Sequence, residues 1–63
     1  MIKAVGELYP TFGKNVRIAE NATVVGDVTL EEGASIWYSA ILRADEAPIR
    51  IGRDTNIQDG AIL

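Results

Sequence analysis

Large apolar residues recur at every sixth position through most of this chain. These anchor positions are Phe12, Ile18, Val24, Leu30, Ile36 and Leu42, and after a nine-residue step they continue as Ile51, Ile57 and Leu63. Two residues before each anchor stands a second small or apolar residue, in order Pro10, Val16, Ala22, Val28, Ala34, Ala40, Ile49, Thr55 and Ala61. Residues two apart lie on the same face of an extended strand. The pattern therefore predicts a series of short strands, each with one inward face.

Turn-forming residues separate these pairs at the same interval. The third residue of each three-residue spacer is Asn15, Asn21, Asp27, Gly33, Ser39, Asp54 or Gly60. Gly, Asn and Asp tolerate a left-handed backbone, so each of these positions is predicted to be a corner with positive φ. Apolar residues do not recur at intervals of three and four, which argues against a helix.

Short strands joined by corners of fixed length describe a coil. With three corners in each turn, residues eighteen apart lie above one another. Across the nine-residue step this spacing becomes twenty-one residues. The expected columns are Phe12–Leu30–Ile51, Ile18–Ile36–Ile57 and Val24–Leu42–Leu63. The fold class is therefore all-β, a parallel β-helix built from hexapeptide repeats with about three coils. An ordinary β-sandwich of short strands is the alternative.

Composition narrows the functional classes. The chain has 63 residues, no cysteine and no histidine, and a formal net charge of −3. Residues 1–63 therefore form a single domain without disulfides, and the absence of a basic cluster argues against nucleic-acid binding. No apolar run suits a signal peptide or a membrane span, so we expect a cytoplasmic protein. A solenoid needs capping units, and the last residue is an inward anchor, so we expect the N-terminal part of a longer, oligomeric protein.

The only interruption of the repeat is the segment from Arg43 to Pro48, where six residues replace a three-residue corner. Insertions into solenoids often mark a binding face. Arg43 is a donor, and Asp45 and Glu46 are acceptors two and three residues further on. The alternative is a solvated corner with a weak surface ion pair.

These motifs resemble the γ-class carbonic anhydrases. The resemblance rests on Leu42-Arg43-Ala44-Asp45-Glu46, on Pro48-Ile49 and Ile51-Gly52, and on Asn56-Ile57-Gln58-Asp59-Gly60. Ser35-Ile36-Trp37-Tyr38-Ser39-Ala40 also fits, so the match covers essentially the whole chain. Ala44 departs from the Gly or Ser that is frequent in the family. The resemblance implies that the β-helix is left-handed, although parallel crossovers are normally right-handed.

The resemblance also implies an activity and a set of site residues. In this family, three histidines at the interface between subunits of a homotrimer hold zinc or another divalent metal, and metal-bound hydroxide converts carbon dioxide to bicarbonate. By position, Gln58 would orient the metal-bound water or substrate, Asn56 would contact substrate oxygens, and Glu46 would move the released proton. Arg43 would pair with Asp45 in its own chain and with Asp59 of a neighbour. Because the sequence contains no histidine, no metal ligand is assigned, and the 63 residues alone are expected to bind no catalytic zinc and to be inactive.

The coil geometry favours a site shared between subunits. Arg43 follows one strand column, whereas Gln58 and Asp59 follow another, so they lie at different corners of the prism, roughly 15–20 Å apart at the rise of a strand. No side chain crosses that distance. We therefore expect these residues to meet across subunits, if they meet.

Two rival functions share the repeat. Hexapeptide acyltransferases use a histidine base and a coenzyme A groove, and the Arg43-x-Asp45-Glu46 loop argues against them here. A non-catalytic trimeric scaffold is the other rival, and it need not bind metal. Trp37 and Tyr38 occupy a corner, where they could pack under Leu8-Tyr9-Pro10 or form a subunit contact.

Overall fold

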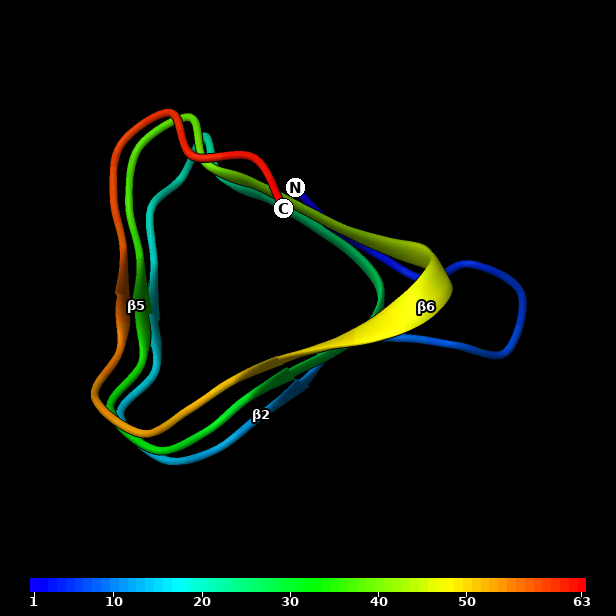
Figure 1. Ribbon diagram of the computed structural model, residues 1–63, viewed down its shortest axis with the longest axis horizontal. Coiled ribbons are helices and arrows are strands. Elements are labelled where there is room, and N and C mark those ends of the chain that lie inside the picture. Colours follow the sequence, from blue (N-terminus) through cyan, green and yellow to red (C-terminus); the bar gives the residue numbers. More distant parts are fainter.

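The computed structural model describes all 63 residues as a triangular coil of strands with no helix (Figure 1). The strands are β1 (Ile2–Lys3), β2 (Thr11–Phe12), β3 (Arg17–Ile18), β4 (Thr23–Leu30), β5 (Ser35–Ile36), β6 (Ile41–Ile51) and β7 (Asn56–Ile57). They wind through about three turns of a β-solenoid, as the hexapeptide pattern predicted. Without helices, the structure has no helical segment that could cross a membrane.

Every pairing between named strands is parallel, as stacking of successive coils requires. β3, β5 and β7 form one sheet along one side of the triangle, and β4 pairs with β1, β2 and β6 in the other. The register reproduces the three predicted columns, with partners Phe12–Leu30–Ile51, Ile18–Ile36–Ile57 and Val24–Leu42. Leu63 completes the last column, because its backbone exchanges hydrogen bonds with Ile41 and Arg43 on either side of Leu42.

The anchors and their small partners form the core inside the prism. In β4 every second residue is buried, which is the alternation expected of a strand with one inward face. The largest fully buried side chains are Val24, Val28, Leu30, Ile36 and Leu42. The core thus lies in the middle coil, where each strand has a neighbour above and below.

The predicted left-handed corners are confirmed at five of the seven positions. Asn15, Gly33, Ser39, Asp54 and Gly60 all have φ between 56° and 78°. The prediction was wrong at Asn21 and at Asp27, neither of which has positive φ. At the second of these corners Gly26 takes the positive φ instead, one residue earlier, and the chain remains in strand β4.

The inserted segment was predicted to be a loop between strands, and this was wrong. It is part of β6, which runs without interruption from Ile41 to Ile51 and follows β4 around the corner on the right of Figure 1. The pair Gly26–Ala44 precedes the irregularity and the pair Val28–Ile49 follows it. The three additional residues are therefore absorbed as a bulge, which bends a strand without ending its pairing.

The coil begins earlier than the repeat indicated. Ile2 pairs with Val24 in β1, and the following loop, closed by two backbone hydrogen bonds between Val5 and Leu8, projects from the same corner as the β6 bulge (Figure 1). The ten-residue step from Ile2 to Phe12 concealed this first anchor. This loop lies across the triangle from β5 (Figure 1), whereas Trp37 directly follows β5 in the sequence and is 44% exposed. Packing of Trp37 under the N-terminal segment was thus a wrong interpretation.

Candidate functional site

The first group of candidate residues lies at the bulged corner of β6. The alternation of the strand buries Leu42 and Ala44 and turns Arg43 and Asp45 outward. Arg43 Nη2 donates to Asp45 Oδ2 at 2.9 Å, and both side chains remain open to solvent. Glu46 is exposed in the bulge and forms no ion pair within the chain.

The Arg43 guanidinium also changes the acidity of its partner. Its hydrogen bond to the carboxylate, helped by backbone hydrogen bonding and by its charge, holds the pKa of Asp45 below the ordinary value for an aspartate. Asp45 is therefore ionised at neutral pH and accepts from Arg43 as a charged group.

The second group belongs to β7 and the corner that follows it. Asn56 lies outward on β7, and its Oδ1 accepts a hydrogen bond from Ser35 Oγ on β5. Gln58 is exposed, and its side-chain amide makes no hydrogen bond within the chain. Asp59 Oδ1 accepts from the backbone N–H of Tyr38, 3.2 Å away in the coil below.

The two groups do not meet within one chain. Arg43 and Asp45 lie in the sheet built on β4, whereas Asn56 lies in the sheet of β3, β5 and β7 on the opposite side of the triangle (Figure 1). No hydrogen bond or ion pair joins them. The separation expected from coil geometry is therefore present, and any shared site needs a second copy of the chain.

The structure adds two residues that the motifs did not point to as site residues. Trp37 Nε1 donates to Ser35 Oγ at 3.2 Å, and Ser35 in turn donates to Asn56, which makes a continuous chain of hydrogen bonds. Beside them, Arg17, Ser35, Trp37 and Tyr38 line a shallow cavity of about 200 Å³. The sequence could have placed Ser35 beneath Asn56, because stacked residues are twenty-one positions apart across the insertion.

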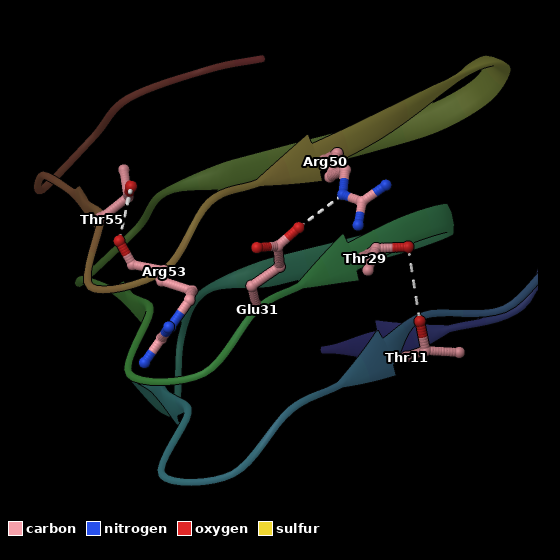
Figure 2. A network of polar contacts seen from close by, with 6 residues as sticks. All are labelled: Thr11, Thr29, Glu31, Arg50, Arg53 and Thr55. Atoms are coloured by element: carbon pink, nitrogen blue, oxygen red, sulfur yellow. Dashed lines mark hydrogen bonds and ion pairs between the residues drawn. The ribbon is translucent and has the colours of Figure 1, made fainter.

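Other polar contacts lie on or just beyond the sheet of β2, β4 and β6, and Figure 2 shows two that connect successive coils, Thr11–Thr29 and Glu31–Arg50. Arg50 Nε donates to Glu31 Oε2 at 2.5 Å, and Thr11 and Thr29 share a longer hydroxyl contact of 3.4 Å. Arg53 pairs with Glu32 at 3.4 Å. The Arg50–Glu31 and Arg53–Glu32 ion pairs lie at the surface, so they contribute little to stability, and neither touches the candidate residues.

The 63 residues do not fit a catalytic zinc site. Zinc sites of this kind use three protein ligands, usually with histidine among them. The chain has neither histidine nor cysteine, and nowhere do three acidic side chains gather closely enough to hold a metal ion. The structure thus provides polar groups for a site, without ligands for a metal.

Comparison with known proteins gives several close relatives, although no family model matches. The chain is 48% identical over its whole length to YtoA of Bacillus subtilis, named an uncharacterized transferase, and covers 37% of it. Over 50 residues, 79% of the chain, it is 50% identical to a probable carbonic anhydrase of Methanocaldococcus jannaschii and covers 31% of that protein. It is 44% identical over 62 residues, 89% of the chain, to a carbonic anhydrase of Geobacillus kaustophilus, of which it covers 34%.

The chain thus spans about a third of the length of these relatives. Identities of this size across most of the chain, together with the solenoid of stacked hexapeptides, agree with the motifs at Arg43–Glu46 and Asn56–Gly60. The 63 residues are therefore homologous to proteins named carbonic anhydrase, gamma carbonic anhydrases of Arabidopsis thaliana among them.

Proposed function

We propose that these coils belong to a homotrimeric γ-carbonic-anhydrase-like metalloprotein that interconverts carbon dioxide and bicarbonate. The observation that carries the proposal is the placement of two polar motifs on opposite sides of one prism. Arg43, Asp45 and Glu46 occupy one corner, and Asn56, Gln58 and Asp59 occupy the far sheet and its corner. A three-fold arrangement would bring the first set of one subunit against the second set of its neighbour.

The proposal gives each residue a role. Arg43, already paired with Asp45, keeps further guanidinium N–H groups free for Asp59 of a neighbouring subunit. Gln58 has an amide free of contacts within the chain and would hydrogen-bond substrate. Asn56 would contact a substrate oxygen, and the exposed carboxylate of Glu46 would pass protons to solvent. The proposal is supported by relatives named carbonic anhydrase that align with 79% and 89% of the chain.

Zinc enters this proposal only through residues outside the 63. Since no ligand set exists in the structure, we assign no metal-dependent step to these coils. Their contribution is to bind, orient and exchange protons.

A chimera provides the test. Residues 1–63 replace the aligned third of the Geobacillus kaustophilus carbonic anhydrase, and carbon dioxide hydration is followed by stopped-flow with a pH indicator. We expect a zinc-containing trimer with hydration well above buffer, reduced at least tenfold by Gln58→Ala or Arg43→Ala. Thr29→Val, which lies beyond the β6 bulge in register with Arg50, should retain activity. A trimeric, zinc-loaded chimera without activity, alongside an active parent, would refute the proposal.

A second candidate is acyl transfer, favoured by the transferase name of the relative YtoA, which aligns with the whole chain. Hexapeptide acyltransferases bind coenzyme A between coils. A chimera in which residues 1–63 replace the aligned part of YtoA is titrated with acetyl-coenzyme A by isothermal titration calorimetry. This measurement discriminates acyl transfer from the anhydrase-like function. Micromolar binding would favour transfer, and its absence would leave the anhydrase-like function as the better account.

A further inference from the structure

Three side chains form a directed hydrogen-bond chain on the outer face of β5 and β7. Trp37 Nε1 lies 3.2 Å from Ser35 Oγ, and Ser35 Oγ lies 2.5 Å from Asn56 Oδ1. The indole N–H can only donate, so Ser35 Oγ accepts from it. The single O–H of Ser35 is then available for the carbonyl oxygen of Asn56. The direction therefore runs from Trp37 through Ser35 to Asn56.

The backbone holds this chain in place. Ser35 pairs directly with Asn56 in the parallel ladder, and Ser35 N–H donates to the Thr55 carbonyl at 2.9 Å. Trp37 N–H donates to the Ile57 carbonyl, also at 2.9 Å. Ser35 is 8% exposed, so its hydroxyl has few opportunities to hydrogen-bond water instead. Backbone pairing on both sides thus fixes the distance between the two coils and keeps the side chains aligned.

The hydrogen bond from Ser35 also determines the direction of the Asn56 NH₂ group. With Oδ1 engaged by Ser35, both N–H donors of Nδ2 are left for the solvent side, because an amide carries its oxygen and nitrogen on opposite branches. Asn56 is itself exposed. The neighbouring cavity has Arg17 in its lining, and Arg17 forms no ion pair within the chain. This face therefore offers the Asn56 donors and the positive charge of Arg17 beside a cavity whose lining is mostly apolar. The nearest carboxylate in these contacts, that of Asp59, already accepts a hydrogen bond from the backbone N–H of Tyr38.

We propose that Ser35 and Trp37 are positioning residues that present the Asn56 NH₂ group as a hydrogen-bond donor to a small oxyanion of the bicarbonate type. The choice of bicarbonate rests on the proposed function, whereas the orientation of Asn56 stands on the hydrogen bonds alone. A donor-only group at this position selects an acceptor oxygen and rejects a ligand that presents an N–H or O–H to it.

The orientation is tested directly by nuclear magnetic resonance on the 63-residue chain. We expect the Asn56 Hδ2 protons to exchange rapidly with water and to show no nuclear Overhauser effect to Ser35 Hβ. We expect the Trp37 Hε1 proton to be shielded from exchange. Protected Asn56 Hδ2 protons with strong contacts to Ser35 Hβ would mean that the amide faces the other way, and would overturn the inference.

Ligand binding is tested by titrating sodium bicarbonate against sodium chloride at equal ionic strength. Bicarbonate should shift the Asn56 Nδ2 resonances and chloride should not. Ser35→Ala should weaken the apparent affinity about three- to tenfold, as expected for one lost orienting hydrogen bond. Ser35→Thr, which keeps the hydroxyl, should restore it, and Thr29→Val, on the sheet of β2, β4 and β6, should leave it unchanged.

The outcomes separate this inference from the proposed function. Equal shifts with chloride, or an affinity unaffected by Ser35→Ala, would overturn the positioning role. If Ser35→Ala unfolds, Trp37→Phe removes the N–H donor while it keeps an aromatic ring at this position, and it should also weaken bicarbonate binding. An inactive chimera with a correctly oriented Asn56 would refute the hydratase function and leave the inference intact.

Discussion

Gly26 and Ala44 approach one another more closely than any residue with a side chain at position 26 would allow. A Cβ atom on Gly26 would lie 2.4 Å from the carbonyl oxygen of Ala44, and the φ of Gly26 is +84°. These two residues pair in the register of β4 and β6 immediately before the bulge. Because Gly26 has no side chain, strand β6, which carries Arg43 and Asp45, can pack directly against β4.

Substitution of Gly26 by alanine should be strongly destabilising. The variant has to adopt a left-handed backbone and also displace the Ala44 carbonyl, which together should cost at least about 2 kcal/mol in the free energy of unfolding. Gly6→Ala is the matched control, because Gly6 has φ +60° and no atom within 4 Å of its added Cβ. It should cost only about 1–2 kcal/mol, for the backbone conformation. Urea denaturation measures both, and equal losses would contradict the close approach at Gly26.

The middle coil should dominate the stability of the chain. Leu42 is fully buried and stacks on Val24, so Leu42→Ala should lower the free energy of unfolding by about 2–5 kcal/mol. Ile62, which is 72% exposed, serves as control, and Ile62→Ala should change it by less than about 0.5 kcal/mol. A comparable loss in the two variants would show that the core is not where the stacked anchors place it.

The Arg43–Asp45 pair should make the stability of the folded chain depend on pH. Because folding lowers the pKa of Asp45, the pair stabilises the folded chain above the ordinary aspartate pKa, and this contribution is lost as pH falls through the lowered value. Carbon-detected titration of the Asp45 carboxyl should give a pKa below the ordinary value, and Arg43→Ala should raise it towards that value. Arg50→Ala removes a different ion pair, with Glu31, and should leave the Asp45 titration unchanged. An Asp45 pKa insensitive to Arg43 would exclude the pair in solution.

Much of the fold could be predicted from the sequence because a single period governs it. Each anchor occupies one inward position per strand, so stacking at eighteen residues, with three added across the insertion, placed Ile18, Ile36 and Ile57 in one column. The sequence predicted less reliably which residue of each corner has a positive φ. Asp27 was expected to carry the positive φ, but a neighbouring glycine adopts this backbone at lower cost, so Gly26 took the role.

The bulge and the first coil escaped prediction for a related reason. Six residues between Arg43 and Pro48 can form either a loop or a continued strand, and only pairing with β4 decides between them. The long step after Ile2 hid its anchor in the same way. For the site, the sequence could place Arg43 at one corner and Gln58 and Asp59 at another. The Trp37–Ser35–Asn56 chain depends on side-chain direction, which the repeat does not specify.

The central claim is that the two polar groups meet only between copies of the chain. Native mass spectrometry, with metal analysis of the same sample, tests it most directly on the wild type, on Arg43→Ala and on Arg50→Ala. We expect a trimer for the wild type and for Arg50→Ala, dissociation for Arg43→Ala, and no stoichiometric zinc on the 63-residue chain. A wild-type monomer, or a trimer that persists in Arg43→Ala, would contradict the shared site.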